Sequence, residues 1–106
     1  MEPSPQGDPF DALGDPHRRA ILQLLSSGER SVGEMADELP ISRPAVSRHL
    51  RLLKDAGLVR DWSEGTKRFY SLDSHGIEAV RSYLEDIWGD AAARFKLVAE
   101  NTRPRR

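Results

Sequence analysis

The stretch from Ser42 to Gly57 restricts the possible folds more than any other part of the chain. Ser42 can accept hydrogen bonds from the free amides of a first helical turn, and Pro44 suits that turn because its missing N–H has no partner there anyway. Gly57 readily adopts the left-handed conformation in which many helices end. Three apolar residues recur at spacings of four and three and form one stripe along the helix: Val46, Leu50 and Leu53. The stretch therefore predicts a helix that buries one side and exposes the other.

The exposed side of this predicted helix is basic. Between residues 43 and 60, five Lys or Arg residues stand against a single acid, Asp55. A helix with one apolar and one basic side fits the DNA major groove, which is wide enough to admit a helix and displays base-edge acceptors to Arg. We expect Arg43, Ser47 and Arg48 at base edges or adjacent phosphates. The residues that we expect to position the helix on DNA are Ser42, Pro44, Arg51 and Lys54.

The segment before this helix completes a helix-turn-helix. Ser31 and Glu34 have the spacing of a capping box, which marks the start of a helix. A short apolar face follows, and Pro40 ends this first helix. Because only residues 40–42 separate the two helices, we expect a helix-turn-helix in which the second helix reads DNA.

After Gly57 the pattern changes to that of a β-hairpin. Residues 58–62 and 68–72 have the composition of strands, and residues 63–67, with Gly65, have that of a loop. A hairpin after a helix-turn-helix is a wing. Lys67 and Arg68 would make its tip basic and able to lie along a phosphate backbone or a minor groove.

A long helix is predicted from Ser74 to about Asn101. Its apolar residues recur at threes and fours over a length of about 40 Å, at ~1.5 Å per residue. One small domain cannot cover so long a stripe, so we expect a homodimer formed by this helix and a short first helix near the N-terminus. The alternative is that the stripe packs wholly within its own chain. The expected interface residues are Phe10, Leu13, Ile77, Val80, Leu84, Ile87, Trp88, Ala91 and Phe95.

A helix is also expected to begin at Asp15 and Pro16 and to end at Gly28. Residues 17–19, His-Arg-Arg, fall in its first turn, where the helix dipole disfavours positive charge. They could contact phosphate or a partner carboxylate, or simply form a solvated basic turn, which is the expectation here.

Several segments together resemble one family. They are Ala12-Leu-Gly-Asp-Pro-His-Arg-Arg19 followed by Ile21-Leu22, Ser47-Arg-His-Leu50 with Leu53, Ala56-Gly-Leu-Val59, and Gly65-Thr-Lys-Arg-Phe-Tyr70. This combination, from about residue 10 to about residue 100, resembles the ArsR-type winged-helix repressors. The resemblance implies a mainly α, homodimeric winged helix-turn-helix that binds near its own or a neighbouring promoter and blocks polymerase. It adds His49, at base edges or adjacent phosphates or in packing of the helix, and Tyr70, in the wing, to the expected DNA-binding residues.

The same resemblance gives no metal site. The chain has no cysteine, and residues 34–39 read Glu-Met-Ala-Asp-Glu-Leu where metal-sensing relatives carry a cysteine motif. The ligand positions of the last helix fall on Ser74, Gly76, Ile87 and Asp90, of which only Asp90 could bind. We therefore expect no metal, no other cofactor, and an exposed His75. Two alternatives remain open: a metal- or ligand-responsive repressor with an unrecognised effector site, and a winged helix that binds protein instead of DNA.

Composition and charge limit the remaining classes of function. At 106 residues the chain is expected to form one domain, residues 9–101, between a disordered tail at 1–8 and a basic tail at 102–106. No stretch reaches the ~20 apolar residues of a membrane span, which favours the cytoplasm. No Ser/His/acid set or Gly-rich phosphate loop stands out, so no enzyme is expected. The net charge of −1 is low for a DNA-binding protein, but the positive charge is concentrated in residues 43–60.

Overall fold

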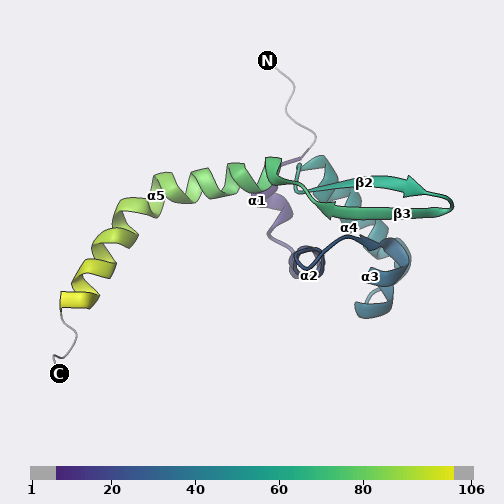
Figure 1. The fold of residues 1–106 in the computed structure, drawn as a ribbon, viewed down its shortest axis with the longest axis horizontal. Coiled ribbons are helices and arrows are strands. Elements are labelled where there is room, and N and C mark those ends of the chain that lie inside the picture. Colours follow the sequence, from purple (N-terminus) through teal and green to yellow (C-terminus); the bar gives the residue numbers. More distant parts are fainter. Residues whose placement is uncertain (1–6, 102–106) are drawn as a thin grey trace, which may run out of the picture.

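The computed structural model describes the backbone of residues 7–101 and, apart from residues 92, 93 and 96–101, their side-chain environments. The chain forms five helices and three strands within this range, and it is mainly helical (Figure 1). In chain order the elements are α1 (Pro9–Ala12), α2 (Pro16–Leu25), β1 (Arg30–Ser31), α3 (Val32–Glu38), α4 (Arg43–Asp55), β2 (Val59–Glu64), β3 (Lys67–Leu72) and α5 (Ser74–Asn101).

Helix α4 forms as the sequence predicts. The Ser42 hydroxyl accepts a hydrogen bond from the Ala45 amide at 3.2 Å, and Gly57 adopts a φ of +77° just beyond the helix. All three residues of the apolar stripe, Val46, Leu50 and Leu53, are fully buried. Around them lie residues of α2, α3 and the sheet, including Ile21, Leu25, Met35, Leu58 and Val59. The predicted two-sided helix is therefore confirmed.

The capping box of α3 is also present. The Ser31 amide donates to the Glu34 carboxylate at 2.8 Å, and the Glu34 amide donates to the Ser31 hydroxyl at 3.1 Å. These hydrogen bonds hold the pKa of the Glu34 carboxyl below its ordinary value. Helix α3 ends at Glu38, two residues before Pro40, so α3 and α4 form the predicted helix-turn-helix.

The wing is a hairpin with a shorter loop than the sequence analysis predicts. Strands β2 and β3 pair antiparallel from Val59 opposite Leu72 to Glu64 opposite Lys67. Two residues, Gly65 and Thr66, connect the strands, and Gly65 takes the left-handed φ of +63° that a tight hairpin needs. The polar residues expected in the loop therefore continue the strands. Strand β1 was not predicted, and its two residues pair with Tyr70 and Phe69 on the other edge of β3.

Helix α5 leaves the body of the domain. In Figure 1 it extends on one side of the helical body and the hairpin on the opposite side. Its start is fixed by Gly76, whose amide donates to the Gly57 carbonyl at 2.7 Å, and a Cβ at Gly76 would lie 2.7 Å from that backbone. Beyond this point it packs against α1, with the Phe10 and Tyr83 rings edge to face at 4.9 Å.

The folded part begins before residue 9. The Asp8 carboxylate accepts a hydrogen bond from the Phe10 amide and caps α1. Gly7 lies against the end of α4, where a Cβ would come within 3.0 Å of the Ala56 amide nitrogen. The rest of the expected N-terminal tail, residues 1–6, and the expected basic tail, residues 102–106, lie outside the described residues. Among the helices described, none is long and apolar enough to cross a membrane.

Candidate nucleic-acid interface

The exposed side of α4 and the wing together surround a basic hollow. Its volume is about 490 Å³, and it lies between the reading helix and strands β2 and β3. Six of the predicted DNA-binding residues line it: Arg43, Ser47, Arg51, Lys54, Arg68 and Tyr70. The structure therefore brings the reading helix and the basic part of the wing to one surface, as the sequence predicts.

The remaining polar residues predicted for DNA lie on the same exposed parts of the chain. Ser42, Pro44 and Arg48 are exposed on α4 or at its N-cap, and Lys67 is exposed at the start of β3. Among the acidic side chains that the structure describes, none forms an ion pair with Arg43, Arg48 or Arg51. Their charges are available to an anionic partner.

One acidic residue that the sequence analysis did not single out connects the helix and the wing. Asp61, on β2, has only 10% of its side chain exposed. Its Oδ1 lies 3.0 Å from Lys54 Nζ on α4, and its Oδ2 lies 2.9 Å from Arg68 Nη1 on β3. Charge-assisted hydrogen bonds of this kind fix side-chain positions. Asp61 therefore connects the reading helix to the wing, and it neutralises part of their charge.

Tyr70 is more deeply buried than the other residues predicted to bind DNA through the wing. Only 8% of its surface is exposed, and it belongs to the hydrophobic core. Successive side chains of a strand point to opposite sides of the sheet. The Tyr70 side chain therefore points toward the core and the Phe69 side chain points away from it. Burial raises the pKa of the Tyr70 phenol, and the Asp61 carboxylate adds to the rise. Tyr70 therefore belongs to the core and also lines the basic hollow, and its DNA contact stays a prediction.

His49 lies on a different side of α4 from the basic hollow. Its half-buried ring faces α2, where it lies 5.8 Å from the His17 ring, centroid to centroid, and its Nδ1 is 3.4 Å from Arg18 Nη1. Burial lowers the pKa of the His49 imidazole, and the Arg18 guanidinium lowers it further, against the opposing effect of Asp15. Of the expected roles for His49, packing of the helix is the one that this position favours.

The basic first turn of α2 binds the end of α1. Arg18 Nε donates to the Ala12 carbonyl at 2.8 Å, and Arg19 Nη1 donates to the Leu13 carbonyl at 2.7 Å. Carbonyl groups at a helix C-terminus carry partial negative charge and lack partners within the helix. The expectation of a solvated basic turn was wrong for Arg18, which is half-buried, whereas Arg19 stays exposed while it donates to Leu13.

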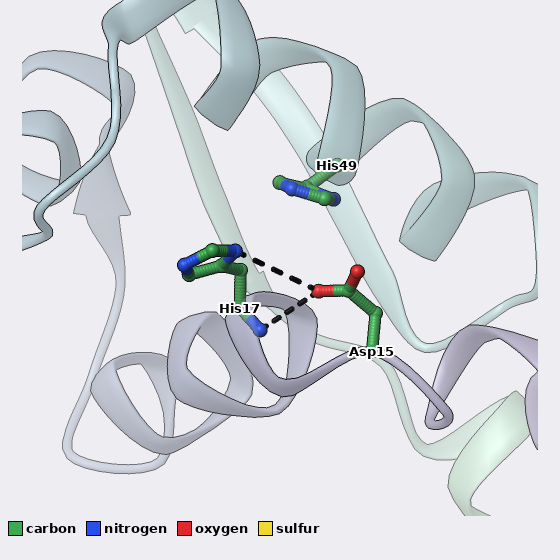
Figure 2. A group of neighbouring side chains, drawn as sticks. All are labelled: Asp15, His17 and His49. Carbon is green, nitrogen blue, oxygen red and sulfur yellow. Dashed lines mark hydrogen bonds and ion pairs between the residues drawn. The ribbon is translucent and has the colours of Figure 1, made fainter.

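Asp15, His17 and His49 come together between α2 and α4 (Figure 2). Asp15 Oδ1 accepts hydrogen bonds from the amides of His17 at 2.7 Å and Arg18 at 3.2 Å. Desolvation alone would raise the pKa of the Asp15 carboxyl, but these two hydrogen bonds and the nearby positive groups outweigh it and lower the pKa. More than thirty residues separate His17 from His49 in the chain, so no spacing rule could have revealed this cluster.

The apolar stripe of α5 is largely exposed. Five large apolar side chains, each between 39% and 76% exposed, lie along it: Ile77, Leu84, Ile87, Trp88 and Phe95. Phe10 and Ala91 are also exposed, and Leu13 and Val80 are half-buried. An apolar hollow of about 320 Å³ lies at the foot of this stripe, lined in part by Leu13, Leu22 and Leu58. The alternative that the stripe packs within its own chain does not hold for these described side chains.

Comparison with known proteins also identifies a helix-turn-helix domain in this chain. Residues 13–61 match the family described as a helix-turn-helix domain. The chain is 51% identical over 86 residues to the HTH-type transcriptional regulator Rv2034 of Mycobacterium tuberculosis, covering 81% of this chain and 80% of that protein. It is 42% identical over 65 residues to the transcriptional repressor SdpR of Bacillus subtilis, covering 61% and 72%.

A crystal structure of an ArsR family transcriptional regulator superposes with a TM-score of 0.70 at 33% identity, covering 74% of this chain and 86% of that one. The chain belongs to the ArsR family of transcriptional regulators. The predicted family and fold, a mainly helical winged helix-turn-helix, are thereby confirmed.

Some ArsR-type proteins sense metals and others do not, so metal binding by this chain depends on which residues stand at the ligand positions. At the positions where the resemblance places ligands on the last helix, Ser74, Ile87 and Asp90 are exposed and Gly76 is buried against Gly57. Only Asp90 carries a donor for a metal, as expected from the sequence, and His75 is exposed as predicted. The named relatives are transcriptional regulators and not enzymes.

Proposed function

We propose that this protein is a homodimeric repressor that binds inverted-repeat operators in double-stranded DNA. One observation carries the proposal. Helix α4 is fixed by a fully buried stripe on one side, and on the other it presents arginines that have no acidic partner among the described side chains, beside a wing with Lys67 and Arg68 exposed. A rigid basic helix of this kind suits a major groove better than a protein surface, so this observation also argues against the protein-binding alternative.

Each part of the surface has a distinct task in this proposal. Arg48 lies in the second turn of α4, next to Ser47 in the sequence and on the side opposite the buried stripe. From there it can donate two hydrogen bonds to a guanine. Arg43 begins the helix, and Arg51 lines the hollow beside the wing, where they can contact phosphates. Lys67 extends the positive surface along the wing. Asp61 holds Lys54 and Arg68 in place for this docking.

In this proposal a second copy of the chain completes the DNA-binding surface. Burial of the α5 stripe against the same stripe of a partner would remove large apolar side chains from water, which is the dominant favourable term in association. A two-fold axis through α5 would direct the two α4 helices into successive major grooves. The operator would then be an imperfect inverted repeat with half-sites about 34–36 Å apart or slightly more.

Repression is the output that we propose. SdpR is named as a transcriptional repressor, and a dimer bound at its own or a neighbouring promoter would block polymerase. Such a protein would work in the cytoplasm, together with the chromosome that it binds.

Binding-site selection from genomic DNA, followed by gel-shift titration at two salt concentrations, tests the proposal. We expect an inverted repeat to be enriched, and the affinity to fall steeply with salt, because each phosphate contact releases counterions. A matched duplex with scrambled half-sites is the control. Equal binding to both duplexes, or no binding at low salt, would contradict the proposal.

A further inference from the structure

We propose that Asp15, His17 and His49 form a binding site for one divalent transition-metal cation of the zinc and cobalt class. This inference replaces the expectation of a chain without a metal site. It concerns positions other than those at which the family resemblance places ligands. It also does not depend on DNA binding, so the two proposals can fail separately.

The three side chains already surround one space. They come from the N-cap and first turn of α2 and from the second turn of α4, and they face each other between these helices (Figure 2). One potential ligand atom from each lies within 4.8 Å of the other two. His17 Nδ1 is 4.0 Å from Asp15 Oδ1, and the two imidazole rings are 5.8 Å apart. Three donors of metal-binding type are thus gathered by the fold before any cation arrives.

The donor set suits particular metals. Two imidazoles and one carboxylate are ligands of borderline cations such as zinc, cobalt and nickel, whereas calcium and magnesium prefer oxygen alone. Three protein ligands leave a fourth position of a tetrahedron for water. The side chains of His17 and Asp15 are 46% and 31% exposed, so a hydrated cation can reach them.

Each ligand has an atom free to bind. Asp15 uses Oδ1 to cap α2, and Oδ2 has no hydrogen-bond partner among the described residues, so it can bind a cation without loss of the cap. Burial lowers the pKa of the His49 imidazole, which favours the neutral form that metals require. His17 sits in the first turn of α2 with nearly half of its side chain in solvent, and its ring can turn toward the other two.

Two adjustments are needed on binding. Tetrahedral ligands at zinc lie about 3.3 Å apart, as follows from bonds of ~2.0–2.1 Å. The donors, now within 4.8 Å of one another, must therefore approach by up to about 1.5 Å. The 3.4 Å contact between Arg18 Nη1 and His49 must also give way. Arg18 keeps its shorter bond to the Ala12 carbonyl at 2.8 Å, which holds the guanidinium on α1. Both changes involve half-buried or exposed side chains outside the hydrophobic core.

A bound cation would join α2 to the reading helix. His49 directly follows Arg48, so the metal would tie the middle of α4 to the first turn of α2. Because the cation binds the folded chain and not the unfolded one, it should raise the melting temperature.

Cobalt titration of the full chain, free of any affinity tag, tests the site. We expect visible ligand-field absorption that saturates at one Co²⁺ per chain, is displaced by Zn²⁺, and is accompanied by a higher melting temperature. His17→Ala and Asp15→Asn should each weaken binding at least about tenfold, since even outer-shell losses cost that much. Asn at position 15 can still cap the helix, so this variant removes the charge and keeps the fold.

The third histidine of the chain provides the control. His75 is exposed at the start of α5, outside the cluster, and His75→Ala should bind cobalt as the wild type does. Absence of saturable absorption, unchanged binding in both His17→Ala and Asp15→Asn, or loss of binding in His75→Ala would each overturn the proposal. Circular dichroism of every variant shows whether the fold is retained.

Discussion

Helices α4 and α5 carry similar apolar stripes with opposite environments. The stripe of α4 is enclosed by α2, α3 and the sheet and has no exposed surface. The stripe of α5 has apolar residues at comparable spacings, yet its large side chains remain 39% to 76% exposed. Spacing tells which face of a helix favours burial, but the partner that buries it depends on where the helix lies. An exposed stripe this long is the mark of an interaction surface, and a second copy is the partner that we propose.

The comparison predicts that the two stripes respond differently to substitution. Leu50→Ala should lower the free energy of unfolding by about 2–5 kcal/mol, because it removes a fully buried side chain and leaves a cavity. Leu52→Ala is the matched control on the exposed side of the same helix, and we expect less than about 1 kcal/mol. Urea denaturation at one fixed protein concentration measures both. A cost for Leu52→Ala equal to that of Leu50→Ala would mean that α4 is rotated.

On α5, a charged substitution should break assembly while the body stays folded. Leu84→Glu should shift the monomer–dimer equilibrium by about 2–5 kcal/mol, the range for loss of a large buried apolar side chain. Sedimentation equilibrium measures this change, and circular dichroism checks the fold. Ser82→Glu, on the opposite face of α5, is the control and should stay dimeric. A monomeric wild type at micromolar concentration would contradict the proposed dimer.

The exposed side of α4 should discriminate between sequences, and the wing should not. Arg48→Ala should cost about 1–3 kcal/mol per half-site and relax base preference at one position in each, since it removes a bidentate contact. Lys67→Ala should weaken binding to all sequences alike and reduce the salt dependence by about one charge per half-site. Fluorescence anisotropy with the selected operator and single-base variants distinguishes the two classes. Retention of full affinity and preference by Arg48→Ala would show that another face of α4 reads DNA.

The smallest expected effect is a pH dependence of the free energy of unfolding, which comes from His49 at the contact between α4 and α2. The pKa of His49 lies below its ordinary value of 6.5 in the folded chain, chiefly because of burial. As the pH falls, the unfolded chain therefore binds this proton first. The His49 contribution to stability is present above the unfolded pKa and is lost as the pH falls through the folded one.

We thus expect the free energy of unfolding to fall as the pH decreases from neutral to below 6.5. His49→Gln should show a shallower slope over this range. Urea melts across the range measure both slopes, and equal slopes in the two proteins would remove His49 as the cause.

The parts of the fold that could be predicted from sequence are those with local signals. Ser42, Gly57 and the capping box of Ser31 and Glu34 mark helix ends by interactions within a few residues. The apolar stripe of α4 has the spacing of a helix, and the wing has strand composition around Gly65. The loop of the wing was predicted too long because polar residues next to Gly65 pair as strands when the ladder continues through them.

The contacts that the sequence did not reveal join residues far apart in the chain. Arg18 and Arg19 satisfy the end of α1, Asp61 connects Lys54 to Arg68, and His49 meets His17. Tyr70 follows the basic residues of the wing in sequence, yet strand alternation turns it into the core. Such positions depend on how the elements pack and cannot be derived from spacing alone.

The stoichiometry of the protein–DNA complex tests the central claim most directly, namely that two exposed α4 helices joined through α5 read the operator together. Analytical ultracentrifugation with fluorescent duplexes compares the full operator with one in which a half-site is scrambled. We predict two wild-type chains on the full operator and a large loss of affinity on the half-site. Leu84→Glu should bind both duplexes with the same weak affinity. One wild-type chain saturating the full operator, or Leu84→Glu binding it as tightly as the wild type, would contradict the claim.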